Sequence, residues 1–447
     1  MAQSDVLICG AGAAGMVAAL AAAARGRRVA LLDPAPEEPS NLAISGGLFA
    51  AAGTRWQRAI GISDGPARFA ADVRTKTGGS ADPVVTAAVT RHSGRVAEFL
   101  ADVAGLPVHL HTAGTWPGHS VPRLHATPAE SGAELSALLR AAVSRDARIE
   151  RRDGEALVGL APGMVEVSAN GTRHHRQVRK VILATGGFGA APDLLTQFCP
   201  AAAGAVHVGG GRSDGMALRL GIALGAAIAC TDAYQGQPHV SPYLIEGQRP
   251  RFGASLPALG AIMVNRRGLR FAAEDMGPSE LAGHVLAQPV GRAFEIWGEA
   301  AQTAAIGGGP FRHAVELGAV RRFDTASSLA AAFGLPDRTF AATLDHVTAC
   351  FAGQAEDPFG RHNWGTPPTP PFFAAEITGG LAHTQGGLLV DDRARALRPD
   401  GTPIPWLFAA GGAACGISGH GATGYVPGNG LAQSFTLGLL AGEAAAS

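Results

Sequence analysis

The sequence predicts an α/β protein organised around a buried parallel sheet, and three features of its opening segment support this. Val6–Cys9 is an unbroken apolar run, typical of a strand that a parallel sheet buries on both faces. Three glycines follow at once in the spacing G-x-G-x-x-G and lead into an alanine-rich helix that reaches about Ala24. A second apolar strand, Arg27–Leu32, then ends at Asp33.

Each residue of this strand–turn–helix–strand segment has a physical reason to be there. Gly10 allows the tight turn, Gly12 lets a pyrophosphate approach the backbone, and Gly15 lets the helix pack closely on the strand. The helix N-terminus offers free N–H groups to phosphates, and Asp33 is placed to accept hydrogen bonds from an adenosine ribose. The segment therefore predicts a Rossmann-like dinucleotide site, against the alternative of a glycine-rich turn without a ligand.

Composition excludes several function classes. The 447 residues are too many for one core and suit two or three domains. Lys+Arg and Asp+Glu both number 36, so bulk charge predicts neither nucleic acid nor a membrane surface as partner. No apolar run is long enough for membrane insertion and no signal peptide precedes the first strand, which predicts a cytoplasmic protein. Lys76 and Lys180 are the only lysines, which is typical of a GC-rich bacterial genome.

The five cysteines are scattered and form no C-x-x-C pair. They support neither a disulfide framework, nor an iron–sulfur cluster, nor a covalently attached haem, and no metal site is predicted.

Further glycine-rich turns follow predicted strands. Ser45, Gly46 and Gly47 form either a second backbone approach to a flat cofactor or an ordinary turn, and we favour the cofactor. The strand in Lys180–Gly189 leads into Ala184, Thr185 and Gly186, which we interpret as another approach to the same nucleotide. Asp214 is a helix cap, a cofactor contact, or both.

The remaining chain is assigned more coarsely. The loop Thr112–Thr127 carries His119, Arg123 and His125, which form either a wall of the site or a solvated loop. We expect helices in Ser63–Ala104, strands Ala147–Leu160 and Met164–Ala169, and a hairpin turn at Asn170–Gly171. We also expect a polar loop Gln235–Arg251, irregular helices to Phe351, and a linker Gly353–Pro371. We expect residues 1–234 and 382–447 to form one domain and residues 235–381 to form an inserted second one.

The last segment returns to glycine-rich turns. A strand at Trp406–Ala410 ends at Gly411 and Gly412, and the loop Gly416–Gly430 leads into the helix Leu431–Ala445. The N-terminus of this helix would stabilise the negative charge of a reduced flavin. The alternative is a closing helix with a flexible lead.

Over nearly its whole length the chain resembles the fumarate reductase/succinate dehydrogenase flavoprotein superfamily. The motifs that carry the resemblance are Gly10–Gly15 with Asp33, Ser45–Gly47, Ala184–Phe188, Ser213–Gly215, His239 after Gln237-Pro238, Ala261–Phe271, His383–Asp391 and Pro405–Gly411. The resemblance implies FAD in a glutathione-reductase-like domain made of both chain ends, with an α+β capping domain inserted. It also implies hydride transfer between flavin N5 and the carbon β to a carbonyl or carboxylate.

The resemblance assigns the cofactor contacts to Gly10, Gly12, Ala13, Ala14, Gly15, Asp33, Ser45, Gly46, Gly47, Ala184, Thr185, Gly186, Asp214, Gly411, Gly412, Gly430 and Leu431. No histidine lies in Asn41–Ala52, so we expect the FAD to be bound without the common covalent link. Gly412 stands where the superfamily usually has a glutamate that contacts the ribityl chain.

The departures from the superfamily concern the dicarboxylate clamp. Asp275–Leu281 lacks the expected arginine, and Thr423-Gly424-Tyr425 replaces the arginine-bearing H-G-x-N-R segment. Gly253-Ala254 stands near the place of a Thr-Glu pair. His239 and His383 remain, but a dianion would lack bidentate partners.

The final loop instead resembles that of 3-ketosteroid dehydrogenases, and Ser279–Pro289 resembles tricarballylate-dehydrogenase-type flavoproteins. We therefore assign Tyr425 and a backbone N–H near Gly428 as donors to a carbonyl oxygen. Tyr243 and His239 are candidate proton-transfer groups, and His383 is a candidate substrate contact beside the flavin. Either histidine is also open to a purely structural role.

Together these features predict an FAD-dependent dehydrogenase acting on a small carbonyl substrate, a ketone or a mono-acid, at the α,β C–C bond. Reduction of an enone or enoate is the second hypothesis, and a non-catalytic electron-transfer subunit is the third. The absence of a second nucleotide motif predicts an external electron acceptor or donor other than NAD(P)H.

Overall fold

The computed structural model describes residues 4–253 and 255–447, which form two compact units. The first unit comprises the chain up to residue 200 together with residues 209–235 and 382–447. The second unit comprises residues 201–208 and 236–381. The short piece 201–208 joins the second unit through strand β11 (Val206–His207), which no sequence pattern indicated. That the second unit caps the first stays a prediction.

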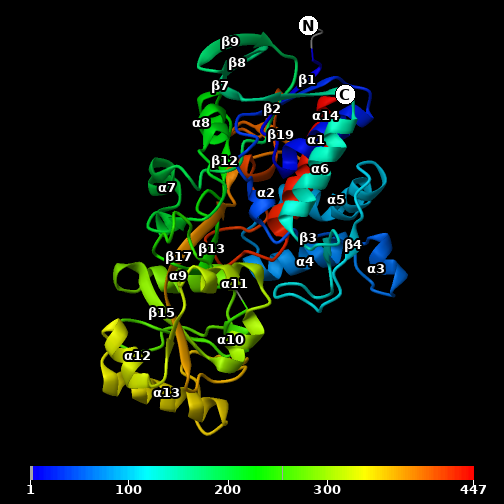
Figure 1. Cartoon of the computed structure of the whole chain (residues 1–447). Coiled ribbons are helices and arrows are strands. Elements are labelled where there is room, and N and C mark those ends of the chain that lie inside the picture. The colour runs from blue at the N-terminus through cyan, green and yellow to red at the C-terminus, as the bar shows by residue number, and fades with distance from the viewer. Residues whose placement is uncertain (1–3, 254) are drawn as a thin grey trace. The chain divides into compact units, whose positions relative to one another are not determined.

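A six-stranded sheet forms the centre of the first unit (Figure 1). Its order is β19 (Arg395–Leu397), β20 (Pro403–Ala409), β10 (Val181–Leu183), β1 (Val6–Cys9), β2 (Val29–Asp33) and β6 (Ile149–Asp153). All neighbours are parallel except β19, which forms an antiparallel pair with β20. Cys9 pairs with Leu183 and Leu183 with Ala409, so β1, β10 and β20 end at the same edge. The loops that follow these strands therefore meet there.

Helices and small sheets surround this sheet. The helices are α1 (Ala13–Ala24), α2 (Asn41–Ile44), α3 (Arg55–Ala59), α4 (Pro66–Thr77), α5 (Pro83–Asp102), α6 (Gly132–Arg145), α7 (Pro192–Phe198), α8 (Met216–Ala223) and α14 (Asn429–Ala445). The small sheets are β3 (Phe49–Ala50) with β5 (Leu124–Ala126) and β4 (His109–Leu110), β12 (Ile228–Ala229) with β18 (Gly387–Leu388), and the meander β7 (Glu155–Ala161), β8 (Met164–Ala169) and β9 (Thr172–Gln177).

The expected single strand Ala147–Leu160 is wrong. Gly154, with φ +80°, breaks it into β6, which completes the parallel sheet, and β7, which starts the meander. The expected turn is present, because Asn170 and Gly171 both have the positive φ that a two-residue hairpin of this type requires.

The second unit has its own mixed sheet, with β17 (Phe372–Thr384) and β15 (Arg292–Gly298) as its centre. The other strands are β11, β13 (Tyr234–Val240), β14 (Ile262–Val264) and β16 (Arg321–Phe323), and the helices are α9 (Pro278–Leu286), α10 (Glu299–Ala305), α11 (Gly309–Glu316), α12 (Ala326–Phe333) and α13 (Asp337–Phe351). Trp297 packs into the apolar cluster on one side of the sheet, while Ile296 packs into the cluster with α12 and α13. Figure 1 shows α12 and α13 in yellow beside β15.

Two expectations for this unit are wrong. The segment Gln235–Arg251 begins in strand β13, although it was expected to be a loop, and β15 interrupts the region expected to be helical up to Phe351. Both strands lie against β17, and pairing with that long strand overrides the weak strand propensity of the Gly and Pro in β13.

Candidate functional site

The turn between β1 and α1 has the shape that a pyrophosphate requires. A Cβ on Gly10, whose φ is +104°, would lie 2.4 Å from the carbonyl oxygen of Ala184, and a Cβ on Gly15 would lie 1.8 Å from that of Gly10. A Cβ on Gly12 would meet nothing within 4 Å, so one side of this turn is open. Gly12 caps α1 without a side chain, and no acidic residue occupies the first turn of the helix. The exposed N–H groups therefore stay available to an anion.

Asp33 ends β2 with an unsatisfied acceptor. The side chain is buried, and no described residue donates a hydrogen bond to its Oδ2, although Arg140 Nη1 lies 3.5 Å away. Burial raises the pKa of this carboxyl above its ordinary value, while Arg140 opposes the shift. A ribose diol would supply the missing hydrogen bonds.

The loops after β10 and β20 border the same turn. Thr185 follows β10 and has a buried hydroxyl without a partner among the described residues. Gly412 follows β20, and its Cα approaches the backbone of Gly187 so closely that a Cβ would lie 2.7 Å from that nitrogen. Three of the glycine turns singled out from the sequence thus come together at one edge of the sheet, as a dinucleotide site in an open α/β sheet requires.

Two other predicted contacts have local structural roles in this structure. The Ser45 hydroxyl donates to the Leu42 carbonyl at 2.8 Å and accepts from the Gly47 N–H at 3.1 Å, which shapes the turn after α2. Asp214 Oδ1 accepts from the Met216 N–H at 3.0 Å, although the N-cap residue of α8 is Gly215 rather than Asp214. Asp214 therefore contacts the start of α8 from one residue before the cap, and cofactor contact by Ser45 or Asp214 stays a prediction.

The N-terminus of α14 offers a second set of free N–H groups. Its cap residue Gly428 has φ +81° and no side-chain cap, and the first turn contains no acidic residue. Asn429 is fully buried, yet neither its Oδ1 nor its Nδ2 has a partner among the described residues. Sequence reasoning treated Asn429 only as part of the glycine-rich lead, although an asparagine between two glycines at a helix start was a usable signal. Leu431 is half-buried in the same first turn.

His383 lies over this helix start. Its ring atoms Cε1 and Nε2 come within 3.1 and 3.2 Å of the position that a Cβ on Gly430 would take. Nδ1 lies 3.3 Å from the carbonyl oxygen of Thr384, so Nδ1 carries the proton and Nε2 is the acceptor. Burial lowers the pKa of His383, which keeps the imidazole neutral at pH 7.

Tyr425 and the Gly428 backbone face each other in the loop before α14. The Gly428 N–H lies near enough to the phenolic oxygen of Tyr425 to affect the pKa of the phenol. Burial raises the pKa of Tyr425 to about 12, and the Gly428 N–H opposes this shift. The hydroxyl therefore stays protonated at neutral pH, so one O–H and one N–H donor lie side by side.

The loop with the undecided histidines is solvated only in part, because residues 112–118 are exposed, whereas its two histidines and its arginine are buried. That these three side chains form a wall of the site stays a prediction. Arg123 is 1% exposed and His125 is fully buried. His125 Nε2 lies 2.9 Å from the Thr54 hydroxyl, and burial lowers the pKa of its imidazole to about 4. His119 is also buried, and its Nε2 contacts the backbone next to Tyr425.

His239 belongs to the second unit. It is buried, and its Nδ1 lies 3.0 Å from Oε1 of the fully buried Glu295. A carboxylate in this position holds the proton on Nδ1 and leaves Nε2 as the basic nitrogen.

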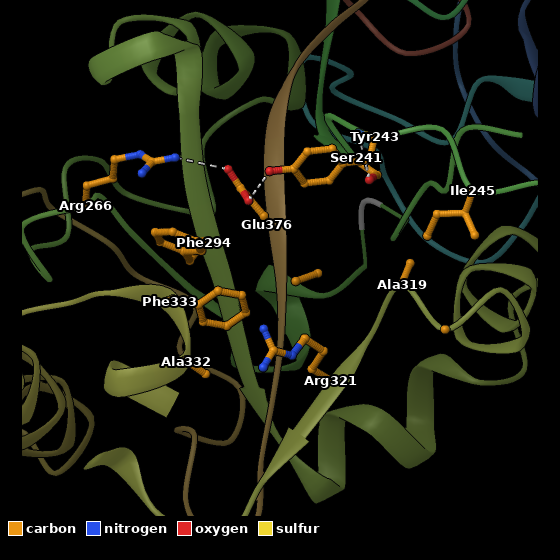
Figure 2. A pocket seen from close by; sticks show the side chains of 12 residues that line it. Ser241, Tyr243, Ile245, Arg266, Phe294, Ala319, Arg321, Ala332, Phe333 and Glu376 are labelled. Atoms are coloured by element: carbon orange, nitrogen blue, oxygen red, sulfur yellow. Dashed lines mark hydrogen bonds and ion pairs between the residues drawn. The ribbon is translucent and has the colours of Figure 1, made fainter. Parts of the chain in front are cut away.

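Tyr243 lines a pocket of the second unit between β15, β16, α12 and β17 (Figure 2). Its hydroxyl donates to Glu376 Oε2 at 2.8 Å and accepts from Arg292 at 2.9 Å. Arg266 also contacts Glu376, at 3.4 Å, and Glu376 raises the pKa of the Tyr243 phenol. The hydroxyl proton is therefore already engaged in a charged cluster.

Arg251 and His207 of the second unit were not singled out from the sequence. Arg251 donates to the Val208 carbonyl at 2.5 Å, and burial lowers its pKa. No acidic side chain within the described residues pairs with it. His207 Nε2 is buried without a partner in the part of the chain that the structure describes. Ala254, which entered the comparison of the dicarboxylate clamp, lies outside the described residues.

Residues 4–253 and 255–447 contain no group of three or more His, Cys, Asp or Glu side chains placed to hold a metal ion. In the same residues, no helix combines the length and apolar character that crossing a membrane requires.

The sequence profile of the family described as "FAD binding domain" matches residues 5–431. The chain is 27% identical to a probable fumarate reductase of Shewanella frigidimarina, over 99% of this chain and 75% of the relative. It is also 27% identical to the 4-oxocyclohexanecarboxylate 2-dehydrogenase of Sinomonas cyclohexanicum, over 98% of this chain and 92% of the relative.

Two solved structures are similar to this chain over nearly its whole length. The open conformation of a flavocytochrome c3 fumarate reductase matches with a TM-score of 0.85 at 27% identity, covering 99% of this chain and 78% of that one. The 3-ketosteroid Δ1-dehydrogenase from Sterolibacterium denitrificans matches with a TM-score of 0.84 at 18% identity, with all of both chains covered, and shows likeness in fold alone.

Proposed function

This chain belongs to the FAD binding domain family and is an FAD-dependent oxidoreductase acting on CH–CH groups, and from that premise we propose that it dehydrogenates the α,β C–C bond of a ketone or mono-acid. The uncapped glycine turn, the unsatisfied Asp33 carboxylate and the uncapped start of α14 all fit a bound FAD. When bound, FAD supplies the hydride acceptor at N5.

One observation supports the carbonyl substrate above the others: the Tyr425 hydroxyl and the Gly428 N–H are neighbouring neutral donors. Removing a proton α to a carbonyl places negative charge on its oxygen, and two preorganised donors stabilise that charge. A neutral pair suits a ketone oxygen, whereas a carboxylate would favour arginine. His383, neutral and half-buried at the start of α14, is proposed as a substrate contact in the same unit.

For the proton transfer we favour His239 over Tyr243. Glu295 orients the His239 imidazole, in the arrangement that prepares a general base. The Tyr243 hydroxyl is instead engaged by Glu376 and Arg292, so its removal of a proton would first require breaking that cluster. Tyr243 stays a second candidate.

The arginines argue against a dicarboxylate. The loop Gly416–Gly430 contains no arginine, and neither does Asp275–Leu281. In the second unit, Arg251 lacks an acidic partner within the described residues, beside the unsatisfied His207. A single cation of this kind favours a substrate with one carboxylate. The Sinomonas relative is named for 4-oxocyclohexanecarboxylate, a keto acid of this class.

Anaerobic mixing of the FAD-loaded protein tests the proposal. We expect 4-oxocyclohexanecarboxylate or another saturated ketone to bleach the visible flavin absorbance, because the protein withdraws hydrogen from it. Succinate should react at least about 100-fold more slowly than the ketone. It has no ketone oxygen to accept from the Tyr425 hydroxyl and the Gly428 N–H, and the two loops named above offer no arginine to bind its carboxylates in a bidentate manner.

The alternatives give distinct outcomes. Reoxidation of the reduced flavin by an enone, without bleaching by a ketone, favours an ene-reductase, as the fumarate reductase relatives suggest. No spectral response to either class favours a non-catalytic electron-transfer subunit. A bacterial source, a cytoplasmic location and an external electron acceptor are further parts of this proposal and rest on the sequence.

A further inference from the structure

A buried ion cluster lies beneath the loop that carries the two proposed donors. The Arg123 guanidinium donates to both carboxylate oxygens of Asp64 at 2.8 Å and to Asp72 Oδ2 at 2.6 Å. Its Cζ lies 4.6 Å from the centre of the Phe69 ring. Arg123 and Asp64 have fully buried side chains, so the guanidinium cannot rotate away from this cluster without leaving a buried charge unpaired.

The cluster determines the tautomer of His119. Arg123 Nη1 lies 3.1 Å from His119 Nδ1, and an arginine N–H always donates. Nδ1 must therefore be unprotonated, and the proton of the neutral imidazole must lie on Nε2. That Nε2–H donates to the Pro427 carbonyl oxygen at 2.8 Å. Burial lowers the pKa of His119, which is consistent with the neutral ring.

The Pro427 carbonyl and the Gly428 N–H belong to one peptide group. This peptide is trans, so its C=O and N–H point in opposite directions. Holding the oxygen toward His119 therefore holds the N–H on the opposite side of the peptide, near the Tyr425 hydroxyl. Pro427 and Gly428 are the central residues of a turn that the Asn429 N–H closes on the Val426 carbonyl at 3.1 Å, and Gly428 has φ +81°. Because a glycine here also tolerates the flipped orientation of this peptide, the contact with His119 selects one of the two.

We propose that His119, oriented by Arg123, is a positioning residue that fixes and polarises the Gly428 N–H as a donor to the substrate carbonyl oxygen. The proposal rests on the proposed function. A hydrogen bond accepted by the peptide carbonyl strengthens the N–H at the other end of the same peptide, so the anchor acts on both direction and donor strength.

Two polar substitutions of similar size separate anchoring from packing. His119→Gln places an amide N–H near the present Nε2 and keeps the contact with Pro427. His119→Asn ends near the present Nδ1, so it keeps an acceptor for Arg123 but does not reach Pro427. We expect His119→Asn to lower kcat for flavin reduction by a saturated ketone about 10-fold, less than the loss of a whole oxyanion donor, with KM changed less than twofold. His119→Gln should stay within about threefold of wild type.

A second readout does not depend on turnover. In FAD-loaded protein labelled with ¹⁵N-histidine, His119 should show a protonated Nε2 and an unprotonated Nδ1 throughout the neutral pH range. The opposite tautomer would overturn the proposal, whatever the kinetics.

The outcomes distinguish the two proposals. A wild-type enzyme that leaves ketones and enones unchanged contradicts the proposed function. A wild-type enzyme that oxidises the ketone, while His119→Asn works equally fast, contradicts only the role of His119. Equal losses in Asn and Gln, with FAD retained in both, also contradict that role, because packing around the ring would then explain the effect.

Discussion

Replacing Tyr425 by phenylalanine is expected to slow flavin reduction by a saturated ketone about 10²–10³-fold while FAD content stays unchanged. The substitution removes only the hydroxyl beside the Gly428 N–H, and this hydroxyl is one of the two donors that we assign to the developing negative charge. The measurement is anaerobic stopped-flow absorbance of the bound flavin, with the FAD-to-protein ratio recorded in the same samples.

Tyr234→Phe is the matched control for this prediction. Tyr234 is a buried tyrosine of the same unit to which we assign no role in the reaction, so its variant should react within a few-fold of wild type. Loss of FAD in Tyr425→Phe would instead place Tyr425 in folding. Equal rates in Tyr425→Phe and wild type would remove it from the reaction.

The pH dependence of the rate of flavin reduction independently tests the assignment of Tyr425 as a protonated donor. Because burial raises the pKa of Tyr425 to about 12, the hydroxyl keeps its proton up to that range. The wild-type rate should therefore show no alkaline loss from this residue below about pH 11.

Gly15→Ala is expected to prevent folding of the first unit, whereas Gly12→Ala should spare the fold and weaken FAD binding. A Cβ on Gly15 would lie 1.8 Å from the Gly10 carbonyl oxygen, and neither backbone can move without disturbing β1 or α1. We expect a loss of about 3 kcal/mol or more, the upper end of what overpacking costs. The checks are the yield of folded protein by circular dichroism and titration with FAD.

Gly12 provides the control in the same turn. Its φ is −79°, an angle that alanine adopts without strain, and a Cβ there would meet no protein atom within 4 Å. The new methyl group would occupy the open side assigned to the pyrophosphate, so FAD affinity should fall about 10-fold or more with little change in stability. Unchanged FAD affinity in Gly12→Ala would mean that the dinucleotide lies elsewhere.

Local chemistry was sufficient to predict the turns that meet at one edge of the first unit's sheet. The spacing of glycines after Cys9, the acidic end of β2 and the glycine turn after Leu183 are each properties of a few consecutive residues. Parallel strands then bring the ends of β1, β10 and β20 to one edge, a consequence of the fold class that the sequence already predicted.

The hydrogen-bond partners of Arg123 and His119 could not be predicted from the residues next to them in the chain. Their loop offered two interpretations, and the structure shows a loop that is exposed over residues 112–118 but buries both side chains. Asp64 and Asp72 precede Arg123 by 59 and 51 residues, and Pro427 follows His119 by 308. Nothing in the loop's own composition indicates such partners.

By itself the sequence determined the fold class, the family and the FAD cofactor, because these depend on backbone patterns that short stretches of chain specify. Only the tertiary structure decided which polar groups are paired and which are left unsatisfied. It fixed the proton on His119 Nε2, it engaged the Tyr243 hydroxyl, and it left the Asn429 amide without a partner and Arg251 without an acidic partner among the described residues. The reason is that burial and hydrogen bonding of a side chain are set by residues distant in the chain.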